Sequence, residues 1–189
     1  MKKIILSAIA IFTIGFANAQ ETKFGVKAGL NLSNLTGDSS DNGVRPSFYV
    51  GGLVEIKVSD KFVVQPELVY SSQGTTSKSD SNYSLQLGYL NIPIMAKYIV
   101  AEGFGLEVGP QVGFLIAASS KGPGGSVDVK DQLSGVDFSL GFGAGYDITE
   151  NFNLGLRYNL GLTKVNKDSV SGSSDVKNSV FQIGVGYKF

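Results

Sequence analysis

The sequence predicts an all-β fold, an eight-stranded antiparallel up-and-down transmembrane β-barrel, from three observations. From residue 22 onward, apolar and polar residues alternate with a period of two, which is typical of strands whose two faces meet different surroundings. The connections between these strands alternate between short and long, and the chain ends on an alternating segment with a terminal aromatic residue. A helical fold is disfavoured because the chain has 25 glycines, each of which costs a helix about 1 kcal/mol.

The predicted strands follow one another along the chain. Each has apolar residues on one face and polar residues or glycine on the other, as in the first, where Phe24 and Leu30 oppose Lys27 and Asn31. The eight ranges are about 23–32, 47–58, 62–72, 85–100, 104–117, 136–148, 152–162 and 178–189. Prolines 66, 93 and 110 lie inside strands, and we expect local bulges there because proline removes a ladder donor.

The lengths of the connections favour a membrane barrel. Short turns are predicted around Asp60, Gly103 and Asn151, whereas the long polar connections span about 33–46, 72–84, 118–135 and 163–177. Outer-membrane barrels have an even number of strands, tight periplasmic turns and longer outer loops. The pattern therefore predicts an outer-membrane location, with both mature termini in the periplasm and four long outer loops.

A soluble, lipocalin-like barrel is the alternative, with its apolar face turned inward around an apolar ligand. The polar face of the predicted strands is rich in Gly, Asn, Gln and Ser rather than in scattered lysines, and the opposite face is bulky and aromatic. This composition favours a barrel with its apolar face outward in lipid. Aromatic residues near strand ends suit two interfacial girdles: Phe62, Phe104, Phe152 and Phe189 on the turn side, and Phe48 and Tyr70 on the loop side.

Residues 1–19 have the pattern of a secretory signal peptide. Lys2 and Lys3 precede an apolar run, and Ala17-Asn18-Ala19 offers a small-x-small cleavage site before Gln20. The apolar run is shorter than the roughly 20 residues that a transmembrane helix needs. The predicted domains are therefore the signal peptide at 1–19 and one outer-membrane barrel at 20–189. The absence of cysteine excludes disulfides and a lipidated N-terminal Cys.

The last eight residues, from Gln182 to Phe189, resemble the outer-membrane assembly signal. The matching positions are the polar Gln182, Gly184, the aromatic Tyr187 and the terminal aromatic Phe189. Such a segment offers an exposed edge strand that another protein can pair with before barrel closure removes the edge. The resemblance implies that the barrel-assembly machinery is a partner of this strand.

The chain also resembles the large porin family of outer-membrane β-barrel domains, which includes PorT-like proteins. The resemblance implies an eight-stranded outer-membrane barrel but no reaction, because the family has no shared catalytic residues. With the two ends of the chain, the matching stretches cover essentially the whole mature sequence: Val64-Gln65-Pro66-Glu67-Leu68-Val69-Tyr70, Tyr89-Leu90-Asn91-Ile92-Pro93-Ile94-Met95-Ala96-Lys97-Tyr98, Val108-Gly109-Pro110-Gln111-Val112-Gly113 and Gly155-Leu156-Arg157-Tyr158.

Charged residues on the inward face form the candidate site. An eight-stranded interior is only wide enough to be filled by side chains, and an unpaired buried charge is costly. We therefore expect a salt-bridged plug, with an ion or proton path as the alternative. The core of this polar network is Lys27, Glu55, Glu67, Lys97, Glu107 and Arg157, and the further inward charges are Lys57, Asp137, Asp147 and Lys188.

The sequence predicts a non-enzymatic protein without a cofactor or metal. The chain has no histidine, which is the commonest general base near neutral pH. The loop opening at Asp38 resembles a calcium loop, but Tyr49 stands where such a loop needs Glu. Balanced charge, with 16 basic and 16 acidic residues, gives no footprint for nucleic acid.

Two functions remain open from the sequence. The first is a structural or surface-interaction role, in which the outer loops contact envelope or extracellular proteins while the barrel wall contacts outer-membrane lipid. The alternative is a narrow channel for ions or small solutes.

Overall fold

The computed structural model describes residues 21–37, 42–166 and 176–189. The predicted signal peptide at 1–19, the predicted first mature residue Gln20 and the segment 38–41 that opens like a calcium loop lie outside these ranges, as does 167–175. No helix in the described ranges is long and apolar enough to cross a membrane.

Eight long strands make up most of the described chain. They are β1 (Glu21–Gly37), β3 (Arg45–Lys57), β4 (Phe62–Ser77), β5 (Ser84–Ala101), β6 (Phe104–Gly122), β8 (Val136–Asp147), β9 (Phe152–Gly161) and β10 (Val176–Lys188). The short elements are β2 (Asn42–Gly43), β7 (Gly125–Asp128) and the 3-10 helix η1 (Lys130–Gln132). All eight predicted strands are confirmed, and β1, β4 and β6 extend several residues farther at the loop end, to Gly37, Ser77 and Gly122.

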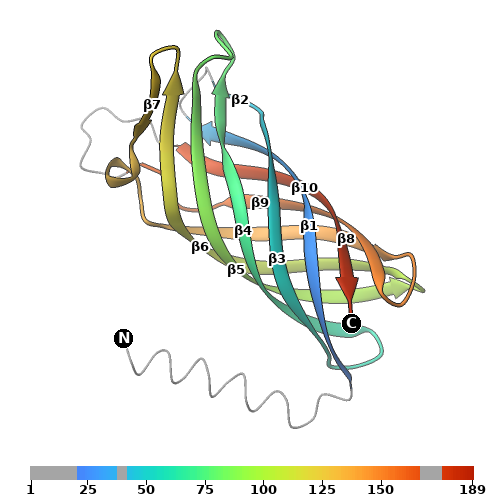
Figure 1. Cartoon of the computed structure of the whole chain (residues 1–189). Coiled ribbons are helices and arrows are strands. Elements are labelled where there is room, and N and C mark those ends of the chain that lie inside the picture. The colour runs from blue at the N-terminus through green and yellow to red at the C-terminus, as the bar shows by residue number, and fades with distance from the viewer. Residues whose placement is uncertain (1–20, 38–41, 167–175) are drawn as a thin grey trace, which may run out of the picture.

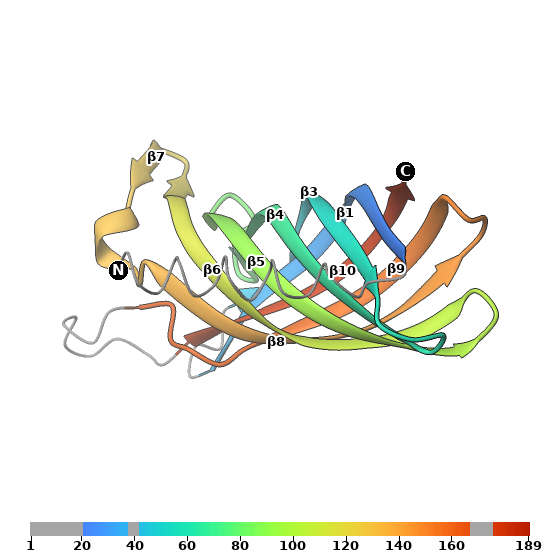
Figure 2. The same cartoon turned by 90° about the horizontal axis from the view of Figure 1, so that it is seen from below.

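The strands close into one antiparallel barrel. Their order around the wall is β4, β3, β1, β10, β9, β8, β6 and β5, and a further pairing of β4 with β5 closes the circle. The first and last strands are neighbours, in register from the pair of Gly25 with Lys188 to the pair of Gly37 with Val176 (Figures 1 and 2). Because closure pairs every long strand on both sides, the main wall has no free edge.

Alternation places apolar side chains outside and polar side chains inside. On β1, Phe24 and Leu30 are 59% and 63% exposed, whereas Asn31 is fully buried in the interior. The same pattern holds on β4, where Leu68 is exposed and Gln65 is buried. A barrel with an apolar outer belt and a polar interior is one surrounded by lipid. The lipocalin-like alternative is therefore excluded.

The two ends of the barrel differ. The short turns that follow β3, β5 and β8 lie at one end together with the C-terminus, at the lower right of Figure 1. The short strands β2 and β7 lie at the other end. In the turn after β5, Gly103 has a φ of +73°, a left-handed conformation that favours glycine. The long connections therefore share the end at which β1, β4 and β6 are extended.

The prediction of bulges at the prolines is wrong. Pro66 pairs with Ile94 and Pro110 with Leu140 without a change of register, and the register shifts of the β5–β6 pair occur between Gly88 and Tyr89 and between Ile99 and Ala101 instead. A one-residue shift turns the following side chains to the opposite face. At mid-wall that would put polar side chains into lipid, so the loss of one ladder hydrogen bond at a proline is the smaller cost.

Candidate functional site in the barrel lumen

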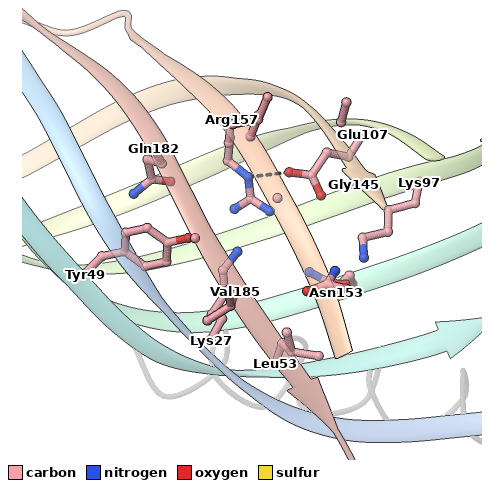
Figure 3. Close-up of a pocket in the computed structure, with 15 residues that line it drawn as sticks. Lys27, Tyr49, Leu53, Lys97, Glu107, Gly145, Asn153, Arg157, Gln182 and Val185 are labelled. Carbon is pink, nitrogen blue, oxygen red and sulfur yellow. Dashed lines mark hydrogen bonds and ion pairs between the residues drawn. The ribbon is translucent and has the colours of Figure 1, made fainter. Parts of the chain in front are cut away.

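Arg157 of β9 is the centre of the lumen. Its guanidinium donates to both carboxylate oxygens of Glu67 on β4, at 2.9 and 2.7 Å, and its Nε donates to Glu107 on β6 at 2.5 Å. Arg157 and Glu67 are 5% and 4% exposed. A two-pronged arginine–carboxylate pair of this kind combines strong hydrogen bonds with a defined geometry. Figure 3 shows Arg157 and Glu107 pointing at each other across the interior.

Glu67 is shared with a second cation. Lys27 Nζ of β1 lies 3.0 Å from Glu67 Oε2, and the Gln65 amide donates to Glu67 Oε1 at 2.5 Å. Lys27 also lies over the Tyr49 ring, 5.6 Å from its centroid. An upper tier of ion pairs is thus formed by Arg157, Lys27, Glu67 and Glu107. Two cations face two carboxylates, so the formal charge of the tier is zero.

A lower tier of ion pairs lies nearer the turn end. Glu55 of β3 accepts from Lys97 of β5 at 3.3 Å and from Lys188 of β10 at 3.4 Å. Lys188 also pairs with Asp147 at 3.0 Å. Two cations again face two carboxylates. The structure thus brings all six residues of the expected polar network into ion pairs and adds Asp147 and Lys188 to them.

Amide side chains form a layer beside the upper tier. Gln182 of β10 donates to Asn31 on β1 at 2.8 Å and accepts from Asn159 on β9 at 2.9 Å. Asn31 in turn donates to Ser71 on β4 at 3.0 Å. Because these side chains link four strands, they tie the walls of the barrel together across the junction of its first and last strands.

The inward glycines leave room for this network. A Cβ atom on Gly143 would lie 2.6 Å from Glu107 Oε1, and one on Gly184 would overlap the Tyr49 hydroxyl and the Ala28 carbonyl. The glycine-rich alternation on β8 is therefore an inward stripe that accommodates side chains such as Glu107 from the neighbouring strand β6.

Little free space remains between the tiers. A cavity beside Lys27, Tyr49 and Arg157 has a volume of about 30 Å³ (Figure 3), and another beside Glu55, Lys97 and Asp147 is of the same size. A space of this size holds about one water molecule. The interior around the ion pairs is therefore packed rather than open.

An apolar cluster occupies the loop end of the lumen, and the sequence patterns did not predict it. It consists of Leu35, Leu87, Tyr89, Leu115, Ala118 and Val165, with Leu85, Val129, Leu133 and Val176 packed against it. Val129 and Leu133 flank η1 in the connection after β7. The sequence did contain one indication of it. Leu85, Leu87 and Tyr89 at the start of β5 are apolar residues at alternate positions on the face that points into the lumen.

The register shift before Tyr89 helps to build this cluster. Leu115 pairs with Tyr89, but the next pair joins Ala117 to Gly88. One extra residue on β6 turns Ala118 inward, at 4% exposed, and leaves Ala117 on the outside. The bulge thus continues the apolar interior toward the loops.

Two expected inward charges lie away from the ion-pair tiers. Lys57 is at the rim, where its ammonium pairs with Asp60 of the adjacent turn at 3.4 Å and is 41% exposed. Asp137 is buried near the loop end and accepts a hydrogen bond from Thr163 at 3.0 Å. Both side chains lie beyond the reach of the central network because they stand at opposite ends of the barrel.

The four matching positions of the C-terminal signal have different surroundings. Gln182 and Gly184 face the lumen, as described above, whereas Tyr187 and Phe189 lie on the outer wall. The Tyr187 ring contacts Phe152 at 4.9 Å and Phe189 at 5.3 Å between centroids. The outer aromatic residues therefore form a cluster at the turn end.

A closed antiparallel wall with an apolar belt, a charge-paired lumen and loops at one end defines a membrane-spanning β-barrel protein. The model of the outer membrane protein beta-barrel domain family matches residues 17–167, and the chain belongs to this family. The predicted outer-membrane barrel family is thereby confirmed. Its location is the outer membrane, and its apolar belt contacts membrane lipid. No curated protein matches the chain.

Solved structures with the same fold are outer-membrane barrels. Neisserial surface protein A superposes with a TM-score of 0.61 at 14% identity, over 90% of this chain and 100% of that one. Ail, the attachment invasion locus protein of Yersinia pestis, superposes with a TM-score of 0.53 at 18% identity, also over 90% of this chain and 100% of that one. At such identities the similarity shows the fold alone.

Proposed function

We propose that this chain is a non-enzymatic outer-membrane barrel whose lumen is a structural plug and whose long outer loops carry a surface-interaction role. The observation that carries the proposal is the filling of the lumen at successive levels, by Arg157 with Glu67 and Glu107, and then by the apolar cluster around Tyr89. The absence of histidine from the sequence supports a non-enzymatic role, because the commonest general base is missing.

We infer that the turns and both mature termini face the periplasm and the long connections face outward. The three short turns share one end of the barrel with the C-terminus, and outer-membrane barrels have short periplasmic turns.

At the other end, Tyr83 and Val127 are 51% and 66% exposed. Exposed apolar side chains on a rigid scaffold are suitable anchors for a protein partner.

The orientation can be tested by cysteine labelling, because the chain has no cysteine of its own. In intact cells, Val127→Cys in β7 should react with a membrane-impermeant maleimide. Glu150→Cys in the turn between β8 and β9 should react only after the outer membrane is permeabilised. Labelling of Glu150→Cys but not Val127→Cys in intact cells would reverse the orientation.

The plug can be tested by electrical recording. Purified protein in planar bilayers should show no steady conductance, since paired charges and packed apolar side chains leave cavities of only about 30 Å³ beside the ion pairs. The alternative, a narrow channel, requires stable openings that are ion-selective. If such openings occur and Glu67→Gln or Glu107→Gln abolishes them, the plug proposal fails and the channel is the function.

We further propose that the C-terminal strand is recognised by the barrel-assembly machinery. Tyr187→Ala, or deletion of Phe189, should lower the amount of folded barrel and raise the amount of protease-sensitive precursor in cells. Phe152→Ala is the matched control, because it removes the same ring contact with Tyr187 but leaves the terminal signal intact. Equal losses in Tyr187→Ala and Phe152→Ala would mean that the aromatic pair acts through packing alone.

A further inference from the structure

The outer wall has an apolar groove that reaches from the middle of the wall toward the turn end. It has a volume of about 430 Å³, spans β1, β3, β4 and β5, and lies open to the outside. Its walls are Phe24, Val54, Pro66, Leu68, Ile92, Ile94 and Phe189, and its floor is formed by Gly25, Gly52, Leu53 and Glu67. It therefore forms a depression in the lipid-facing surface.

Gly52 makes the groove. Gly52 pairs with Val26 on one side and with Leu68 on the other, and it stands at an outward position between Val50 and Val54. A Cβ atom at Gly52 would have as its nearest neighbour the Gly25 carbonyl oxygen at 3.8 Å, so the space above it is open. Every direct neighbour on the outer face has a side chain. The absence of one at Gly52 is what leaves the depression.

The groove points toward a cationic rim. It follows β3 from Gly52 to Val54, and Lys57 at the end of the same strand and the exposed Lys61 flank the turn beyond it. Five residues of strand span about 17 Å, which is close to half of the roughly 30 Å hydrocarbon thickness. Lys57 pairs with Asp60, whose side chain is 98% exposed, and such exposed pairs contribute little.

We propose that this groove binds a phospholipid, with one acyl chain along Gly52 between Phe24 and Leu68 and the phosphate at Lys57 and Lys61. Two features support this occupant. The groove is continuous with the wall that contacts membrane lipid, and the two lysines complement the charge of a phosphate one acyl-chain length away. The choice of a phospholipid rests on the proposed periplasmic position of the turns.

Native mass spectrometry of the purified barrel with palmitoyl-oleoyl phosphatidylglycerol tests the groove. The unmodified protein should retain one more lipid molecule than Gly52→Phe, whose ring fills the depression. Ala144→Phe is the matched control: Ala144 is an outward residue on the opposite wall, between Leu106 and Leu156, and its replacement should leave retention unchanged. Heat-modifiable gel mobility verifies that each variant is folded.

The headgroup contact has its own measurement. Lys57→Gln and Lys61→Gln should each lower the preference for phosphatidylglycerol over diacylglycerol with the same chains by about fivefold. Equal lipid retention by Gly52→Phe and the unmodified protein would overturn the proposal. The proposal would also fail if the unmodified protein were a dimer and Gly52→Phe a monomer, because a second copy of the chain would then occupy the groove. Because cysteine labelling at Val127 reports the orientation separately, either failure of the groove is distinguishable from a reversed barrel.

Discussion

Arg157→Ala should lower the free energy of unfolding of the barrel by about 3–5 kcal/mol, the usual cost of removing one side of a buried ion pair. The substitution strands two carboxylates, since Glu67 loses both of its guanidinium hydrogen bonds and Glu107 loses its own. Lys27 remains beside Glu67, but nothing replaces the contact with Glu107 from β9. The measurement is the urea midpoint of the folded barrel in lipid vesicles.

Lys121→Ala supplies the control for Arg157→Ala. Lys121 is an exposed residue at the loop end of β6, so its removal should change the midpoint by no more than the roughly 0–1 kcal/mol of an exposed charge. A second comparison is Glu107→Gln, which keeps an acceptor for Arg157 while removing one charge, and should cost less than Arg157→Ala. If Arg157→Ala and Lys121→Ala shift the midpoint equally, the central ion pairs do not stabilise the barrel.

Gly184→Ala should destabilise the barrel strongly and reduce its yield, although it adds a single methyl group. The new Cβ atom would overlap the Tyr49 hydroxyl and the backbone carbonyl of Ala28 on the neighbouring strand. Because a backbone atom cannot move without disturbing the β1–β10 pairing, we expect the upper part of the roughly 1–3 kcal/mol range for overpacking. Refolding yield and the urea midpoint measure the effect.

Gly155→Ala is a close match for Gly184→Ala. Gly155 is the direct cross-strand partner of Gly184, and a Cβ atom there would meet nothing within 4 Å. Its substitution should therefore leave both yield and midpoint close to those of the unmodified protein. Should the two variants behave alike, the role of Gly184 in the C-terminal signal would be recognition rather than packing against Tyr49.

The alternating pattern was sufficient to predict the wall. Phe24 and Leu30 facing out and Asn31 facing in follow from a period of two, because successive side chains of a strand point to opposite faces. The contrast between short and long connections likewise predicted which ends of the strands are joined tightly. Strand ends were less predictable: β4 continues to Ser77 and β6 to Gly122, since pairing with a neighbour holds polar segments that have no alternation of their own.

The sequence predicted that the interior would hold charged side chains, but it did not predict which of them would pair. The sequence assigns Lys27, Glu67 and Arg157 to the inward face, but it does not say that Arg157 meets Glu67, 90 residues away, rather than Glu55. That choice depends on the stagger of the strands, which sets the depth of every residue in a closed barrel. The register shift at Gly88 and Tyr89, which no proline marks, is equally a product of pairing.

By itself, the sequence determined the eight strands, their two faces and the balanced set of charges inside, because these depend on local alternation and on the cost of burying unpaired charge. Only the tertiary structure decided that the charges form two neutral tiers, that Leu87 and Tyr89 close the loop end, and that Gly52 leaves a groove in the outer wall. Each of these features requires contacts between residues of different strands. The shear of the closed barrel sets those contacts, and no single segment of the chain encodes it.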